Sequence, residues 1–257
     1  MSTNRENGSL YTSISDNVAR VEFGHPASNS FVSELLSRLS TEITKLSDNA
    51  EVSLIVLQSE GDRAFCAGAS FDELVAIADL EEGKEFFSGF ARVINAMRTC
   101  KKPIIGRVQG KAVGGGVGLI AACDYVFATE AAAVRLSEIT IGIAPLVIAP
   151  AVERKIGKGG LAELSLSPTE WKNAYWAKEK SLFSRVFDSI AAMDKELDHF
   201  IHQLAGYNPE ALQALKKIFW EGTGHWDVLL SERAEESGRL ALSPETKRAL
   251  DKFKNKK

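Results

Sequence analysis

The stretch that decides the fold of this chain runs from Lys102 to Glu138 and reads KPIIGRVQGKAVGGGVGLIAACDYVFATEAAAVRLSE. It opens with Pro103 and an apolar run, which is typical of the start of a buried strand. The three glycines Gly114–Gly116 follow, and residues 117–122 are small or apolar, as in a short buried helix. The first turn of a helix offers free N–H groups and positive partial charge, so this turn favours a bound oxyanion. Residues 125–128 predict a second buried strand, and Glu138 follows one more apolar segment.

Composition bounds the class of protein. The chain has 257 residues, of which 45% are hydrophobic and 25% charged, which is ordinary for one globular domain or a domain with an appendage. A net charge of -3 without a basic stripe argues against nucleic-acid binding. No apolar run approaches the ~20 residues of a membrane span, and the polar residues 2–8 do not resemble a signal peptide.

The three cysteines, Cys66, Cys100 and Cys123, lack metal-ligand spacing. They favour a reducing, cytoplasmic location over a secreted one. A dense run of lysines ends the chain, and we expect it to form a solvated tail.

Strands and helices alternate in the first half of the chain. We predict strands at 10–15, 18–23 and 53–57, and helices from a cap at Ser30, at 71–78 and at 81–98. After Glu138 only helices are predicted, at 148–156, 161–166, 169–178, 190–204, 210–220 and 228–242. No low-complexity linker interrupts them, so we expect any boundary near residue 190 to be packed.

Two glycine-containing loops point to one kind of chemistry. The run from Gly114 is not a dinucleotide-binding fingerprint, because Leu119 stands at its sixth position, and no GK[ST] follows to make a P-loop. Taken alone, it is explained equally well by tight packing. The loop Arg63–Ser70, however, also offers backbone N–H groups after a buried strand. Two such loops can hold one carbonyl oxygen that develops negative charge.

Four segments carry a resemblance to a known family. They are AFCAGASFDEL (64–74), PIIGRVQGKAVGGGVGL (103–119), CDYVFA (123–128) and LSEITIGI (136–143). Together they resemble the crotonase superfamily, the enoyl-CoA hydratase/isomerase family of acyl-CoA and fatty acid metabolism. The early loop HPASNSF (25–31) is also similar. The resemblance covers about the first two thirds of the chain, and the C-terminal helices match only in general character.

The resemblance implies an α/β fold, a spiral of ββα units with a C-terminal helical trimerisation region. Residues 1–190 would form the core with the acyl-CoA site, and residues 191–257 the oligomerisation region of a homotrimer or hexamer. The implied substrate is an acyl-CoA thioester, so coenzyme A belongs to the substrate. No further cofactor, metal, nucleic acid or membrane is implied.

The resemblance also implies roles for particular residues. The backbone N–H groups of Ala67 and Gly115 would form an oxyanion hole for the thioester carbonyl and stabilise the enolate formed when a proton moves. The surrounding loops would contact the substrate through Arg63, Ala64, Gly68, Ala69, Ser70, Gly114 and Gly118.

The acid–base residues depart from the family pattern. Hydratases of this family carry two glutamates, of which Glu138 matches the second, whereas Gly118 stands at the position of the first. One carboxylate suffices to move a proton between carbons, so double-bond isomerisation is favoured, with Glu138 as acid and base. Dienoyl isomerases have a further acid eight residues after this glutamate, where this chain has Leu146. Asp72 or Glu73 could replace the missing acid.

Other functions stay open at this stage. Hydration of an enoyl-CoA, including a branched one, is the main alternative, followed by thioester hydrolysis and non-catalytic acyl-CoA binding. Trp171 is expected in the core or at an interface, and Cys66 is expected to pack rather than react. An oligomer is also predicted from apolar stripes on the last helices, formed by Leu197, Ile201 and Leu204 and by Leu212, Leu215 and Phe219.

Overall fold

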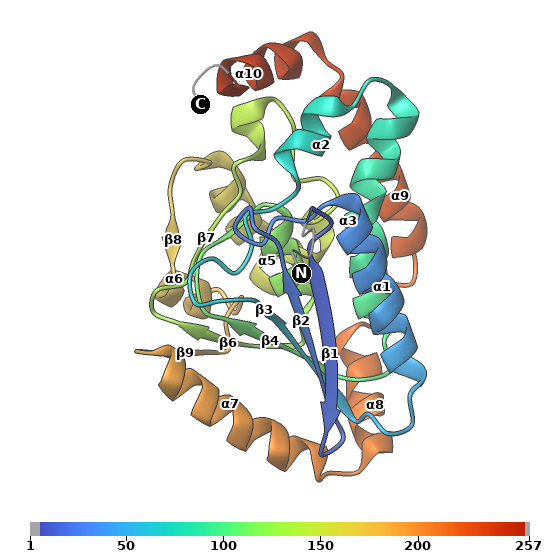
Figure 1. Cartoon of the computed structure of the whole chain (residues 1–257), viewed down its shortest axis with the longest axis vertical. Helices are drawn as coiled ribbons and strands as arrows, with labels where there is room; N and C mark the ends of the chain where they lie inside the picture. Colours follow the sequence, from blue (N-terminus) through green and yellow to red (C-terminus); the bar gives the residue numbers. More distant parts are fainter. Residues whose placement is uncertain (1–5, 255–257) are drawn as a thin grey trace.

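The computed structural model describes residues 6–254 (Figure 1). Residues 2–5 of the polar N-terminal stretch, and Lys256 and Lys257 of the lysine tail, lie outside the described residues.

A six-stranded sheet forms the centre of the molecule, in the order β1-β2-β3-β4-β6-β9. Only β1 is antiparallel to its neighbour. A turn at Asp16 and Asn17 joins β1 to β2, and both residues have positive φ, 50° and 61°, as a tight hairpin turn requires. The strands are β1 (Ser9–Ser15), β2 (Val18–Gly24), β3 (Leu54–Ser59), β4 (Ile104–Val108), β6 (Tyr125–Thr129) and β9 (Arg185–Phe187).

A smaller sheet of three strands brings the glycine run and the segment of Glu138 side by side. It consists of β5 (Ala112–Val113), β7 (Ala133–Arg135) and β8 (Lys172–Asn173). β5 and β7 are parallel, with Val113 opposite Arg135. The glycine run directly follows β5 and Glu138 follows β7, so this pairing brings the glycines and the glutamate together.

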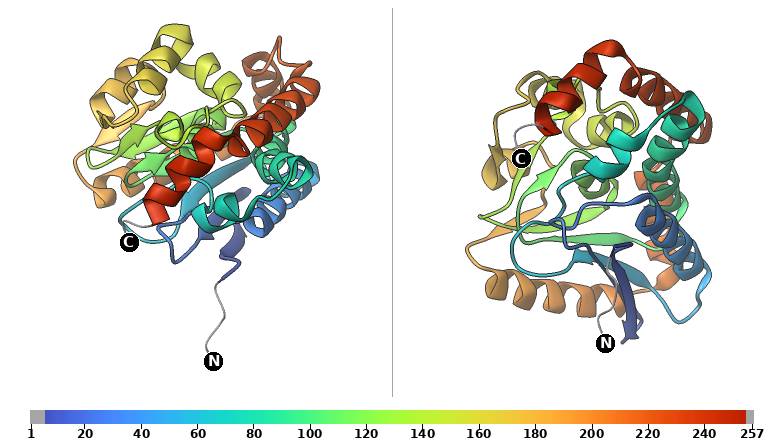
Figure 2. Two further views of the ribbon diagram at one scale, coloured as in Figure 1. Left: turned by 90° about the horizontal axis from the view of Figure 1, so that it is seen from above. Right: turned by 45° about the horizontal axis from the view of Figure 1, so that its top comes forward.

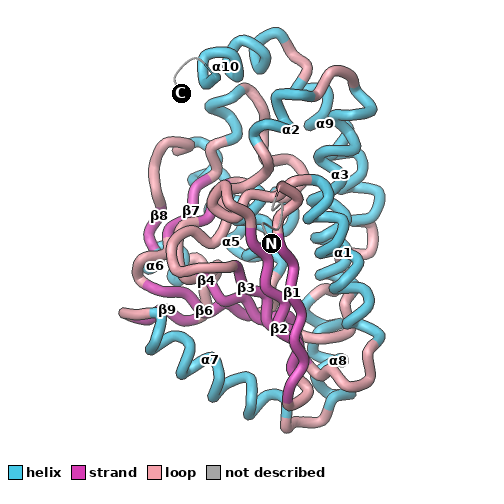
Figure 3. The backbone as a smooth tube through the Cα atoms, in the orientation of Figure 1, coloured by secondary structure: helices cyan, strands magenta, loops and turns pink. Residues whose placement is uncertain are grey.

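Helices cover both faces of the large sheet. α7 packs against one face, and α1, α3 and α9 lie side by side beyond the other (Figures 1 and 2). Figure 3 shows the strands gathered between these layers. The helices are α1 (Ser33–Asp48), α2 (Phe71–Ala76), α3 (Leu80–Thr99), α4 (Gly115–Ala122), the 3₁₀ turn η1 (Glu138–Ile141), α5 (Ala149–Leu166), α6 (Ala174–Glu179), α7 (Ile190–Ala205), α8 (Pro209–Phe219), α9 (Trp226–Ala241) and α10 (Pro244–Lys254).

Three local predictions were wrong. Ser30 does not cap α1, whose N-cap is Val32 and whose first amide, Ser33 N–H, is bonded instead by the Glu73 carboxylate. The segment after Glu138 is not purely helical, because it contains β8, a strand of the smaller sheet, and β9, a strand of the large sheet. The predicted helix at 169–178 is accordingly a strand followed by α6, since β8 pairs with β7.

Other helix boundaries also differ from the prediction. The predicted helices 148–156 and 161–166 form the single element α5, with a break at Gly157, where φ is 71°. α10 was not predicted.

The C-terminal helices are packed into the protein to different degrees. Leu197 and Ile201 of α7, predicted to face a second subunit, are buried against the large sheet instead. On α8, Leu212 is buried as well, whereas Leu215 and Phe219 are 46% and 44% exposed. α9 lies so close to α3 that a Cβ on Gly83 would be 2.9 Å from Gly238 Cα. The described part of residues 191–254 therefore contributes to the core of the protein, and within it α8 exposes part of the predicted apolar stripe.

Candidate active site

A cavity of about 470 Å³ lies between α2, α3, the glycine run and η1. One wall is aromatic and is made by Phe71 of α2 with Phe86, Phe87 and Phe90 of α3. The segment 141–148 supplies an aliphatic wall. This lining suits an apolar group such as an acyl chain.

Each glycine of the run is required by a different neighbour. Gly114 has φ 53°, and a Cβ there would lie 2.8 Å from Glu138 Oε1. A Cβ on Gly115 would collide with the Phe90 ring, and one on Gly116 would be 2.7 Å from Cys66 Cβ. The run thus brings bare backbone against the glutamate, the aromatic wall and the loop Arg63–Ser70.

The two predicted loops, Arg63–Ser70 (the first loop) and the glycine run from Gly114, lie close together in the fold. Cys66 bridges to Ala112, and Val113 N–H donates to Cys66 O at 2.9 Å. Gly68 has φ 94°, and a Cβ there would be 3.1 Å from Val113 O and 3.9 Å from Gly115 N. The two loops therefore bring two sets of backbone N–H groups into the same region.

The choice of donor in the first loop needs correction. Ala67 N–H donates to Ser28 O at 3.1 Å, so it is already committed. Gly68 O and Ser70 N–H both bond to Phe31, which turns the N–H of Ala69, the residue between them, to the other side. Among the described residues, neither Ala69 N–H nor Gly115 N–H has a hydrogen-bond partner, and both residues line the cavity.

Glu138 presents its carboxylate to the cavity from the first residue of η1. Its Oε2 is buried and has no hydrogen-bond partner in the described part of the chain. Burial raises the pKa of this carboxyl to about 7, although the backbone N–H groups of Glu138 and Ser137 partly offset the effect. A group with such a pKa can both accept and return a proton near neutral pH.

A second acid does not join Glu138. Gly118 is buried outside the cavity lining, and a Cβ there would lie 2.7 Å from Ile148 Cβ. Glu73 accepts hydrogen bonds from Ser33 N–H and Oγ–H at 2.9 and 2.8 Å, and Asp72 is exposed; neither lines the cavity. Glu138 is therefore the sole carboxylate among the described lining residues, and Leu146 lines the aliphatic wall.

The remaining residues named from the sequence do not line the cavity. Arg63 is exposed, and neither it nor Ala64 lines the cavity. Ser70 is the N-cap of α2 and accepts from Glu73 N–H at 3.3 Å. Cys66 packs beneath Gly116, and burial raises the pKa of its thiol to about 12, so it is not a nucleophile at neutral pH.

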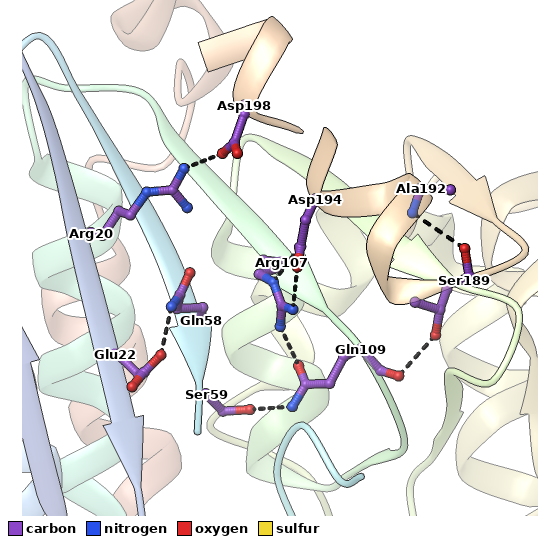
Figure 4. A network of polar contacts seen from close by, with 11 residues as sticks. Arg20, Glu22, Gln58, Ser59, Arg107, Gln109, Ser189, Ala192, Asp194 and Asp198 are labelled. Atoms are coloured by element: carbon purple, nitrogen blue, oxygen red, sulfur yellow. Dashed lines mark hydrogen bonds and ion pairs between the residues drawn. The ribbon is translucent and has the colours of Figure 1, made fainter. Parts of the chain in front are cut away.

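Two buried amides that the sequence analysis missed hold the start of this loop. Ala64 O accepts from Asn29 Nδ2 at 2.9 Å and from Gln109 Nε2 at 3.2 Å. Gln109 also donates to Ser59 Oγ at 2.9 Å, at the end of β3 (Figure 4). The signal available in the sequence was that the polar Gln109 directly follows the apolar strand β4.

The Gln109 contact belongs to a larger polar network. Arg107 bonds to both carboxylate oxygens of Asp194 at 2.6 and 2.9 Å, and Arg20 pairs with Asp198 (Figure 4). Both aspartates lie on α7, so this network ties α7 to the strands beneath the first loop.

Comparisons with known proteins identify the family of this chain. The family model for enoyl-CoA hydratase/isomerase matches residues 13–256. The chain belongs to the enoyl-CoA hydratase/isomerase family. It is 30% identical over 210 residues to a 2,3-dehydroadipyl-CoA hydratase of Escherichia coli, covering 81% of this chain and 80% of that protein. It is 27% identical over 188 residues to a peroxisomal Δ(3,5)-Δ(2,4)-dienoyl-CoA isomerase of Arabidopsis thaliana, covering 68% and 67%.

Solved structures share the fold. An enoyl-CoA hydratase from Mycobacterium avium superposes with a TM-score of 0.83 at 25% identity, covering 98% of this chain and 97% of that one. An enoyl-CoA hydratase from Bacillus halodurans gives a TM-score of 0.87 at 20% identity, with 95% and 99% covered. The predicted crotonase-like α/β fold is confirmed.

Two further properties concern the described residues. No helix between residues 6 and 254 is long and apolar enough to cross a membrane. Within the same range, no group of three or more His, Cys, Asp or Glu side chains is arranged to hold a metal ion.

Proposed function

We propose that this family member shifts the double bond of an enoyl-CoA, with Glu138 as the one acid–base group. The observation that carries the proposal is that Glu138 is the sole carboxylate among the described cavity-lining residues, with Oε2 unpaired. Its pKa near 7 suits a group that must take a proton and return it.

The proposed oxyanion hole consists of the N–H groups of Ala69 and Gly115. Ala69 replaces the predicted Ala67, whose amide is bonded to Ser28. Two donors from converging loops would bind the thioester oxygen as it becomes negatively charged, and preorganised donors of this kind stabilise an enolate strongly.

The proton transfer follows from this arrangement. Glu138 removes a proton from the α-carbon of a 3-enoyl-CoA, and the electron pair spreads over a dienolate whose charge lies on the thioester oxygen. Glu138 then returns the proton to the γ-carbon, which leaves a 2-enoyl-CoA and restores the carboxylate. No water and no second acid enter these steps.

The test uses purified protein with a 3-enoyl-CoA and, separately, a 2-enoyl-CoA, with products separated by chromatography. We expect interconversion of the two isomers and little 3-hydroxyacyl-CoA. E138Q should abolish turnover, because it keeps the shape and removes the base. D72N is the matched control, since Asp72 is exposed outside the cavity, and it should retain activity.

Hydration is the second candidate, because the similar proteins from Escherichia coli and Mycobacterium avium are named hydratases. It needs a second group to handle the proton of water. Rapid formation of 3-hydroxyacyl-CoA from the 2-enoyl-CoA would favour this function and contradict the isomerase proposal.

We also propose a homotrimer or hexamer. Leu215, Ile218 and Phe219 of α8 are 46%, 57% and 44% exposed and supply an apolar surface for contact between subunits. Light scattering at micromolar concentration tests this, and a monomer would contradict it.

A further inference from the structure

Arg135 is a half-buried cation that pairs with no carboxylate among the described residues. It ends β7 and lines the cavity that holds Glu138. Its Nε is buried without a hydrogen-bond partner, and its guanidinium forms no ion pair with any residue between 6 and 254. Burying an unpaired polar group is costly, so such a group at a cavity marks a place where a ligand completes the pairing.

An aromatic ring holds this side chain in place. The guanidinium carbon of Arg135 lies 4.5 Å from the centre of the Trp171 ring. The pairing of β7 with β8 places Trp171 opposite Arg135, because Val134 is opposite Lys172 in an antiparallel register. Stacking on the indole orients the cation at little cost in side-chain entropy when a ligand binds.

A second cation shares the ring but not the cavity. Lys111 Nζ lies 4.8 Å from the centre of the same indole. Lys111 is exposed and is not among the lining residues. Lys111 therefore provides a control: it contacts the same ring as Arg135 but does not line the cavity.

Arg135 and Glu138 are the two charged residues among the described lining residues. They form no ion pair with each other, and Arg135 Nε and Glu138 Oε2 are both buried without a hydrogen-bond partner in the described part of the chain. The two charges therefore act on different parts of a ligand, with Glu138 at the reacting carbons and Arg135 elsewhere on the molecule.

We propose that Arg135 binds a carboxylate on the acyl group, so that the preferred substrates are CoA thioesters of dicarboxylic acids. This inference rests on the proposed acyl-CoA function of the same cavity. A guanidinium binds a carboxylate through two parallel hydrogen bonds, and the surrounding apolar walls strengthen them. A phosphate of CoA could supply the same chemistry, but a phosphate is strongly hydrated and the apolar lining suits the acyl chain better.

Binding of two matched saturated thioesters tests the inference without turnover. Glutaryl-CoA and pentanoyl-CoA have the same number of acyl carbons and differ in the terminal carboxylate. Calorimetry should show that the wild type binds glutaryl-CoA about ten- to a hundred-fold more tightly, the range expected for a charge-assisted pair. R135M should remove this preference, since methionine keeps an apolar stem against Trp171, and K111M should keep it.

Each outcome separates the hypotheses. Equal affinity of the wild type for both thioesters overturns the inference and leaves the proposed function intact. If R135M weakens both thioesters and free CoA by the same factor, the anion is a CoA phosphate and the inference is also overturned. Failure to bind either thioester overturns the proposed function together with the inference. A melting curve for R135M that matches the wild type excludes misfolding as the cause.

Discussion

Replacing Glu138 by glutamine should stabilise the protein while it removes the catalytic base. The carboxylate is placed in an apolar cavity with Oε2 unpaired, so its ionised form is unfavourable in the folded state. The amide of glutamine has nearly the same shape and carries no charge. If one variant lost activity and gained free energy of unfolding, Glu138 would be a residue that serves function and lowers the stability of the folded protein.

The magnitude follows from the pKa. The ordinary pKa of 4.5 is raised to about 7 by burial. Because the folded pKa lies above the unfolded one, the folded state binds the proton more tightly. Stability from the protonated carboxyl is complete below pH 4.5 and is lost as the pH rises to about 7. Relative to the wild type, E138Q should therefore gain about 2.5 kcal/mol more at pH 8 than at pH 5.

Urea unfolding of both proteins at the two pH values measures this difference. Effects of the amide that do not depend on pH cancel in the comparison. An equal gain at both pH values would refute the raised pKa of Glu138, since the carboxyl would then ionise equally easily in the folded and unfolded chain.

The remaining predictions concern the site and its supports. The rate of 3-enoyl-CoA isomerisation should rise with pH and reach half its maximum near pH 7, because Glu138 must be ionised to act as base; a midpoint near pH 4.5 would contradict the assigned environment. Gly118→Ala should lower the free energy of unfolding by about 1–3 kcal/mol, because the added methyl would lie 2.7 Å from Ile148 Cβ. Ile148→Ala in the same chain should recover part of that loss, and strict additivity in urea unfolding would argue against the contact. Gln109→Leu should lower the free energy of unfolding by about 1–3 kcal/mol, because it leaves buried hydrogen-bond partners unpaired. It should also lower kcat more than it raises KM, since the first loop loses a hydrogen bond at Ala64 O. An unchanged kcat would exclude a positioning role for Gln109.

The two loops of the candidate site could be predicted because their signals are local. The glycines from Gly114 need little more than their own sequence to be read as a tight turn into a helix, and the alternation of apolar segments predicted β3, β4 and β6. The predictions failed where a distant partner decided the outcome. Ser30 was expected to cap α1, but Glu73 supplies that hydrogen bond from 40 residues away in sequence. Lys172 joined a strand because β7 offered an edge to pair with.

The sequence by itself determined the α/β fold, the family and the three groups on which the proposed chemistry rests: two glycine-containing loops and the carboxylate of Glu138. These depend on residue type, spacing and backbone propensity, which are properties of short stretches of chain. Tertiary structure decided which of the groups are available. Ala67 and Ala69 are both alanines of the same loop, so the sequence does not distinguish them. In the folded chain Ser28 O accepts from Ala67 N–H, whereas the bonds of Phe31 to Gly68 and Ser70 leave Ala69 N–H without a partner among the described residues. Ile148 likewise occupies the space beside Gly118, and the apolar walls raise the pKa of Glu138. Hydrogen bonding, steric exclusion and desolvation all depend on neighbours that only the folded chain brings together.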